Sequence, residues 1–207
     1  MNADRDEQLR QNEQHRQKMI RRKQLHEKKL AAATVEKGLL IVHTGAGKGK
    51  TTAALGMVFR ALGHGQRVGV VQFTKGAITT GEALLAEKLA PQLVWHTLGK
   101  GYTWDTQDRQ ADIAVARAAW AKACELLRDP TFNLVVLDEL NIVLRYDYLP
   151  LPDVLAELTG RRPELHVVVT GRNAKAQLIE AADLVTEMTL IKHPFRSGVK
   201  PQPGIEY

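Results

Sequence analysis

The chain of 207 residues has one cysteine, Cys124, so it can form no disulfide within itself. A lone thiol suits a reducing compartment, and its place in a helical pattern indicates a small buried hydrophobe rather than a reactive group. No apolar run approaches the roughly 20 residues that span a bilayer. No hydrophobic segment follows the charged residues 1–7, as it would in a signal peptide. These absences predict a cytoplasmic protein without a membrane partner.

A concentrated basic surface is also lacking outside the N-terminus. The formal net charge is +6, and residues 1–37 hold ten Lys or Arg against six Asp or Glu. Nucleic acid binding usually needs a compact basic face, so nucleic acid is an unfavoured partner. A basic arm of this kind either binds an anionic small molecule or remains solvated.

Residues 1–37 contain no Gly or Pro, and their few apolar residues are too scattered to form a core face. This pattern predicts a helical N-terminal arm that packs on something else or frays. The boundary is expected at Lys37-Gly38, with a folded domain over residues 38–207.

From Gly38 onward, short β-rich runs alternate with helical runs. Alternation of this kind predicts an α/β fold with a mainly parallel six-stranded sheet and helices on both faces. Asn173 is expected to cap the last helix. The expected strands cover 39–43, 67–73, 93–97, 133–138, 165–170 and 184–190. The expected helices cover 50–62, 81–89, 106–128, 152–158 and 173–181.

The strongest motif, Thr44-Gly-Ala-Gly-Lys-Gly-Lys-Thr-Thr52, follows the first expected strand and opens the first helix. It fits the end of the phosphate-loop pattern G-x-x-x-x-G-K-[ST], but Thr44 stands at the first position. The glycines allow backbone N–H groups to turn toward phosphate oxygens. Lys50 supplies a positive charge, and the Thr51 hydroxyl suits Mg²⁺. A glycine-rich turn without a ligand is the disfavoured alternative.

Two adjacent carboxylates, Asp138 and Glu139, stand at the carboxyl end of an apolar strand. P-loop proteins carry the acidic residue of their Mg²⁺ site at such a position. We expect at least one of the two to serve the metal, although an acidic turn or helix cap remains an alternative.

A P-loop alone does not define a reaction. Gly99–Asp108 forms an expected loop in which Tyr102 and Trp104 point the same way if extended. These aromatic side chains either anchor the loop to the core or stack on bases. An ATPase stimulated by nucleic acid, a small-molecule kinase and a transferase of another part of ATP therefore all remain open.

From about Gly38 to the end, the sequence resembles the P-loop type of ATP:corrinoid adenosyltransferase, close to the enzyme acting on cob(I)yrinic acid a,c-diamide. The shared segments follow one another in order, and Thr44 itself fits the family pattern. They are Thr44–Thr52, Val70–Gly76, Gly101–Gln107, Leu137–Leu140, Tyr146–Pro150, Thr170–Arg172, Lys192–Phe195, Gly198–Lys200 and Gly204–Tyr207.

The resemblance implies a P-loop (RecA-like) domain that transfers the 5′-deoxyadenosyl group of ATP to cobalt(I) and releases triphosphate. The nucleotide lies reversed relative to the usual P-loop orientation. A nucleic-acid-stimulated ATPase or a small-molecule kinase is the alternative. The implied nucleotide-binding residues are Gly45, Ala46, Gly47, Lys48, Gly49, Lys50, Thr51, Thr52, Arg60 and Arg172. The implied catalytic residues are Lys50, Thr51, Glu139, Tyr102 and Trp104, and the metal residues are Thr51, Glu139 and Asp138.

The resemblance also implies cofactors and partners. Mg²⁺, or Mn²⁺ in its place, accompanies ATP, and cobalt arrives only within the corrinoid, which is cob(I)yrinic acid a,c-diamide, cobinamide or cobalamin. Tyr102 and Trp104 match an aromatic pair at the lower corrin face that excludes the axial ligand and so eases reduction of cobalt. An electron donor such as a flavoprotein and a second copy in a homodimer are expected. The arm either covers the corrinoid or stays a solvated tail.

Overall fold

The computed structural model describes residues 2–74, 80–98 and 108–206, so Tyr102 and Trp104 lie outside the described residues. The chain divides into two compact units, Met1–Glu36 and Lys37–Tyr207.

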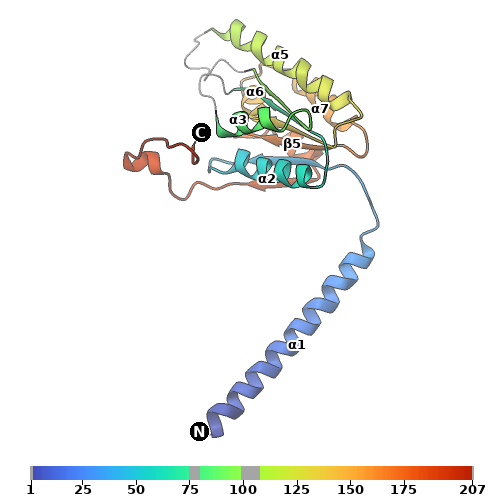
Figure 1. The fold of residues 1–207 in the computed structure, drawn as a ribbon, viewed down its shortest axis with the longest axis vertical. Coiled ribbons are helices and arrows are strands. Elements are labelled where there is room, and N and C mark those ends of the chain that lie inside the picture. Colours follow the sequence, from blue (N-terminus) through green and yellow to red (C-terminus); the bar gives the residue numbers. More distant parts are fainter. Residues whose placement is uncertain (1, 75–79, 99–107, 207) are drawn as a thin grey trace. The chain divides into compact units, whose positions relative to one another are not determined.

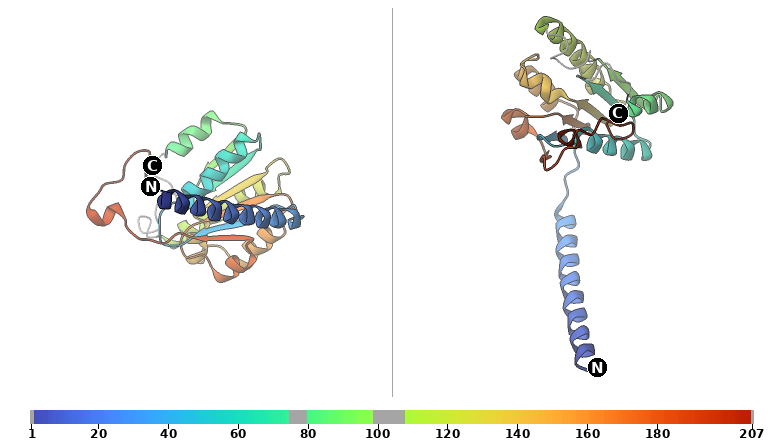
Figure 2. Two further views of the ribbon diagram at one scale, coloured as in Figure 1. Left: turned by 90° about the horizontal axis from the view of Figure 1, so that it is seen from below. Right: turned by 90° about the vertical axis from the view of Figure 1, so that its left-hand side faces the viewer.

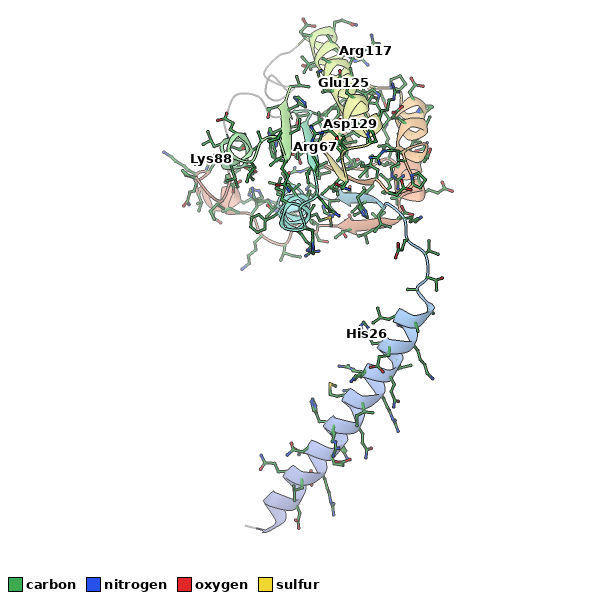
Figure 3. All side chains as sticks on the ribbon, turned by 45° about the vertical axis from the view of Figure 1, so that its right-hand side comes forward. His26, Arg67, Lys88, Arg117, Glu125 and Asp129 are labelled. Carbon is green, nitrogen blue, oxygen red and sulfur yellow. The ribbon has the colours of Figure 1, made fainter. Side chains whose placement is uncertain are left out.

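The first unit contains one long helix, α1 (Asn2–Ala32). From Asp6 onward its residues are exposed, except for the half-buried Met19. Side chains leave this helix on all sides, and His26 is labelled among them (Figure 3). The helical conformation expected for the arm is confirmed, and no apolar face concentrates along it.

The second unit is built on a six-stranded sheet in which all paired strands are parallel. The order is β3-β2-β4-β5-β1-β6, so the first strand lies between the last two (Figure 1). The predicted α/β class with a parallel sheet is confirmed. The strands are β1 (Leu40–Thr44), β2 (Val68–Gln72), β3 (Leu93–Thr97), β4 (Leu134–Asp138), β5 (His166–Thr170) and β6 (Leu184–Glu187).

Helices cover both faces of the sheet, as the turned views in Figure 2 show. Alternating strand residues enter different cores: Leu40 and Val42 on one side, Ile41 on the other. The α2 face is covered by α2 (Lys50–Gly63) and α3 (Gly81–Lys88). The opposite face is covered by α5 (Arg109–Arg128), α6 (Leu140–Arg145), α7 (Leu151–Thr159) and α8 (Ala176–Ala181).

Two sequence-based expectations need correction. Asn173 does not cap α8, because that helix begins at Ala176 with Lys175 at the N-cap, and Asn173 has a left-handed backbone with φ 56°. The last strand ends at Glu187 rather than at residue 190. The next residues, Met188 and Thr189, leave β6 to pack along the loop after β1.

The amino end of the sheet is closed by a cluster around Arg67. Its guanidinium lies 3.8 Å from the Asp129 carboxylate and stacks 4.4 Å from the Phe132 ring centroid. Figure 3 labels Arg67 and Asp129. Ligands of parallel sheets bind at the carboxyl ends of the strands. The Arg67 cluster therefore stabilises the end of the sheet opposite to the one where a ligand is expected. No helix in the described part of the chain is long and apolar enough to cross a membrane.

Cys124 is half-buried on α5, and burial raises the pKa of its thiol. A thiol with a raised pKa is a weak nucleophile near neutral pH. This agrees with the structural role expected for the lone cysteine.

Candidate functional site

The loop between β1 and α2 has the backbone of a phosphate loop. Gly45 and Gly49 have φ values of 96° and 105°, which favour glycine strongly. Gly49 is also the residue before the first turn of α2, which begins at Lys50. The N-terminus of the 14-residue helix α2, which carries a partial positive charge, therefore directly follows the loop.

The segment that follows β6 packs so closely against this loop that two of the loop positions have no room for a side chain. A Cβ on Gly45 would lie 2.4 Å from the Met188 carbonyl oxygen, and one on Gly47 2.6 Å from that of Thr189. The Gly47 N–H donates to the Met188 carbonyl at 2.7 Å, and the Met188 N–H donates to the Thr44 carbonyl at 2.9 Å. One of the amides expected to face phosphate is thus engaged by the protein itself. Residues 188–189 form a wall of the loop.

Lys50 lies inside the loop with 6% of its surface exposed. Its ammonium donates to the carbonyl oxygens of Gly45, at 2.9 Å, and Gly47. Burial lowers the pKa of Lys50, the Glu139 carboxylate opposes that shift, and Arg172 and Lys48 reinforce it. The hydrogen-bond acceptors that hold the ammonium inside the loop are thus neutral carbonyl oxygens.

The first turn of α2 and the ends of β4 and β5 meet at Asp138, which is 1% exposed. The Thr51 hydroxyl donates to Asp138 Oδ1 at 2.8 Å, and the Thr170 hydroxyl donates to the same oxygen at 2.7 Å. The structure thus brings together two of the three residues predicted to serve a metal. Hydroxyl and carboxylate oxygens are the donors that Mg²⁺ prefers, so this donor set fits the predicted ion.

Glu139, the third predicted metal residue, follows β4 with a left-handed backbone of φ 65°. Its N–H donates to the Thr170 hydroxyl at 3.0 Å. This backbone turns the chain from β4 into α6. The Glu139 side chain is half-buried, and its negative charge stabilises the charged form of Lys50 and so raises the pKa of that lysine. Asp138 and Glu139 consequently face different surroundings, as their alternation along the strand predicted.

Lys48, at the outer side of the loop, forms an ion pair with Glu206. A turn presents Glu206, whose N–H donates to the Gln202 carbonyl at 2.9 Å. The C-terminal segment therefore reaches the same loop as residues 188–189, from a position 158 residues away in the sequence.

Of the other predicted nucleotide residues, Arg172 follows β5 near enough to lower the pKa of Lys50. Ala46 and Thr52 are exposed at the loop and at the first turn of α2. Arg60 lies in the last turn of α2, ten residues beyond Lys50. At about 1.5 Å per residue this places it roughly 15 Å along the helix from the loop. The structure does not bring Arg60 to the others.

Reasoning from the sequence assigned no role to Gln72, Thr170 or Glu206. Gln72 and Thr170 are buried polar residues at the last position of a strand, and the Gln72 amide donates to Asp138 Oδ2 at 3.0 Å. A polar residue at the end of an apolar run is a visible signal for such a role. Glu206 carried no such signal, because its contact depends on the course of the C-terminal segment.

Comparison with known proteins defines the family. The model for ATP:corrinoid adenosyltransferase BtuR/CobO/CobP matches residues 36–207. The chain is 54% identical to the corrinoid adenosyltransferase of Pseudomonas aeruginosa, with 94% of this chain and 96% of that protein covered. It is 55% identical to that of a Sinorhizobium species, covering 93% and 91%. For Escherichia coli K12 the identity is 44%, covering 94% and 98%.

Among solved structures, the flagellar accessory protein FlaH from Methanocaldococcus jannaschii aligns with a TM-score of 0.48 and 10% identity, covering 74% of this chain and 72% of that one. At that level the match carries no argument about this chain. The family model and the relatives at 44–55% identity do. With its phosphate loop, buried Lys50 and Thr51–Asp138 contact, the chain belongs to the ATP:corrinoid adenosyltransferase family BtuR/CobO/CobP.

Proposed function

We propose that this chain binds ATP with its triphosphate in the loop Gly45–Gly49 and transfers the adenosyl group to the cobalt of a corrinoid. Membership of the family and the names of relatives at 44–55% identity support adenosyl transfer from ATP to a corrinoid. The single observation that carries the site assignment is the buried Lys50 ammonium, aimed at the loop carbonyls beside the Thr51–Asp138 contact.

In the proposed reaction cobalt(I) attacks C5′ of ATP. A Co–C bond forms with the electron pair of cobalt, the C5′–O bond breaks, and triphosphate leaves with the electrons of that bond. Negative charge then develops on the leaving group, where Lys50 and the N-terminus of α2 stabilise it. Carbon is attacked because the loop grips the phosphates and leaves the ribose end of ATP facing out.

Thr51, Asp138 and Glu139 are the residues proposed to hold Mg²⁺, with Mn²⁺ as a substitute. When bound, the ion neutralises part of the triphosphate charge. The Thr51 hydroxyl donates a hydrogen bond to Asp138, so the lone pairs of the hydroxyl oxygen are directed away from that carboxylate. Lys48 and Arg172 add positive charge near the loop.

Tyr102 and Trp104 are proposed at the lower corrin face, on the resemblance alone. An electron donor such as a flavoprotein, a homodimeric state, a cytoplasmic location and a role in cobalamin biosynthesis belong to the same proposal. The arm of residues 1–37 is proposed to order over the corrinoid, whose carboxylates suit its basic side chains.

One incubation tests the reaction. The full chain is mixed with ATP, Mg²⁺ and a chemically reduced corrinoid, and visible spectra and phosphate products are recorded. A light-sensitive Co–C product together with triphosphate supports the proposal. Release of ADP or inorganic phosphate with an unchanged corrinoid spectrum contradicts it and favours a kinase or an ATPase.

A further inference from the structure

A chain of hydrogen bonds crosses three neighbouring strands at the carboxyl end of the sheet. The indole N–H of Trp95 donates to the Thr97 hydroxyl at 3.1 Å, and that hydroxyl donates to Gln72 Oε1 at 3.0 Å. The Gln72 amide then donates to Asp138 Oδ2 at 3.0 Å.

The sheet topology brings these side chains together. In the parallel register Gln72 pairs with Thr97 on one side and with Asp138 on the other. Two residues earlier on their strands, Val70 and Val136 pack in the core beneath α2. Because side chains alternate between the two faces of a strand, Gln72 and Asp138 point to the face that α2 covers. Thr51 lies in the first turn of α2.

The direction of the chain is fixed by its first member. An indole nitrogen can only donate, so the Thr97 oxygen accepts from Trp95 and its proton is free to go to Gln72. Gln72 must then turn its carbonyl oxygen to Thr97 and its NH₂ to Asp138. The reverse orientation would set the carbonyl of Gln72 against a carboxylate, in a place where the amide is 1% exposed and no bulk water relieves the repulsion.

We propose that Gln72, oriented by Thr97 and Trp95, is a positioning residue for the metal site. It holds one oxygen of Asp138 so that the other accepts from the Thr51 and Thr170 hydroxyls. The rotation of the carboxylate, and through it the direction of the Thr51 oxygen, is thereby set before ATP and the ion arrive. This inference rests on the proposed metal role of Thr51 and Asp138.

We expect the loss of the Gln72 hydrogen bond to weaken metal binding and to leave metal-free nucleotide binding nearly unchanged. Partners that orient a metal-binding group typically contribute 10- to 100-fold in metal affinity or activity. Gln72→Met keeps the length of the side chain and removes its donor. We expect it to raise the Mn²⁺ concentration for half-saturation of the ATP complex about tenfold or more, whereas ATP binding without metal, which depends on the loop and Lys50, changes less than twofold.

The test measures three quantities on the full chain: free Mn²⁺ by electron paramagnetic resonance during titration with ATP present, ATP binding in EDTA by calorimetry, and the midpoint of thermal unfolding. Gln92→Met is the matched control, because its Nε2 donates to the carbonyls of Leu62 and Gln66, away from Asp138. Thr97→Val is a second variant at an exposed position, expected to weaken Mn²⁺ binding in the same sense by a smaller factor.

Each outcome bears on one claim. If Gln72→Met and Thr97→Val bind Mn²⁺ with ATP as the wild type does, while Asp138→Asn does not, the positioning role is refuted and the metal site stands. If Asp138→Asn and the wild type bind Mn²⁺ equally, the proposed metal site itself fails. If metal-free ATP binding falls as much as Mn²⁺ binding in Gln72→Met, the residue is structural and the inference is wrong. Should Gln72→Met fail to fold, the same comparison is decided by Thr97→Val.

Discussion

The ammonium group of Lys50 is held by two carbonyls of its own loop and is almost fully buried. Backbone carbonyls are neutral acceptors, so the triphosphate offers this charge a much stronger partner. We expect Lys50→Ala to lower kcat for adenosyl transfer by at least about a hundredfold, as removal of one stabilising donor at a developing charge does in other enzymes. Steady-state rates from chemically supplied cobalt(I) measure the effect.

Lys122→Ala is the control for Lys50, because its partly exposed side chain lies on α5, on the other face of the sheet from α2, where its ammonium forms an ion pair with Glu125. The lowered pKa of Lys50 adds a pH dependence. Below that pKa the side chain is charged, and as pH rises through it the charge is lost earlier than for an ordinary lysine. kcat/KM is therefore expected to fall on the alkaline side, since it reports the free enzyme. A flat profile up to the pH where ordinary lysines titrate contradicts this expectation.

Trp104 is a residue whose role depends on the resemblance alone, so it calls for a comparison of two assays. We expect Trp104→Ala to lose most activity when cobalt(II) and a reductant are supplied, and much less when cobalt(I) is supplied chemically. The reason is that the ring is proposed to exclude the axial ligand and ease reduction, a step that chemical reduction bypasses. Equal losses in both assays would show that Trp104 is structural.

Among the elements, the phosphate loop and the segment after β6 depend on each other through backbone contact. Gly47→Ala places a Cβ 2.6 Å from the Thr189 carbonyl, so the two backbones must separate. We expect a loss of roughly 1–3 kcal/mol in the free energy of unfolding, as in other overpacked sites, together with weaker ATP binding. Urea unfolding measures the first and calorimetry the second.

Gly56→Ala is the matched control, because it lies within α2 and its Cβ meets nothing within 4 Å. Alanine favours a helix interior over glycine by about 0.5–1 kcal/mol. This variant should therefore be slightly more stable, with ATP binding unchanged. A Gly47→Ala protein as stable as Gly56→Ala would disprove the dependence.

The strands and most helices were predictable from the sequence because each is a local pattern. Five β-rich runs match β1 to β5 within one residue at each end. The helix α6 was missed, since its six residues follow Asp138-Glu139 without a break and no glycine or proline marks its start. The cap of α8 was misplaced because Asn173 resembles a capping residue in sequence but adopts a left-handed turn.

The site was only partly predictable, for a physical reason. The phosphate loop and the pair Asp138-Glu139 are local motifs, and both could be found in the sequence. The convergence of Thr51, Asp138 and Gln72 depends on β2 and β4 being neighbours, and strand order is not encoded in any single run. The contact between Lys48 and Glu206 is equally non-local.

At the scale of the whole molecule, the division of the chain at Lys37 invites a truncation. Lys37 belongs to the second unit and forms an ion pair with Asp183 of that unit, so the cut is best made after Glu36. If the arm orders over the corrinoid, the chain without residues 1–36 should show a raised apparent KM for corrinoid and an unchanged KM for ATP. Identical kinetics for the two chains would refute a role of the arm in this reaction.

The C-terminal segment offers a second test at this scale. The Lys48–Glu206 ion pair is partly exposed, with 43% and 20% of the two side chains accessible. Pairs of this kind contribute little, so the triphosphate can displace it. Glu206→Gln is expected to tighten tripolyphosphate binding about two- to fivefold. Glu157→Gln, which removes the partner of Arg128, is the control; an effect of equal size there would mean that only net charge matters.

The position of β1 between β5 and β6 has a consequence for synthesis on the ribosome. In the order of synthesis the phosphate loop comes well before both neighbours of its strand and before the wall at Met188-Thr189. A nascent chain that stalls before residue 166 carries the whole glycine motif and none of the strands that frame β1. Truncated messages should therefore yield products that nucleotide-affinity resins do not retain, because the ATP site is complete only after residues 166–189 have been made.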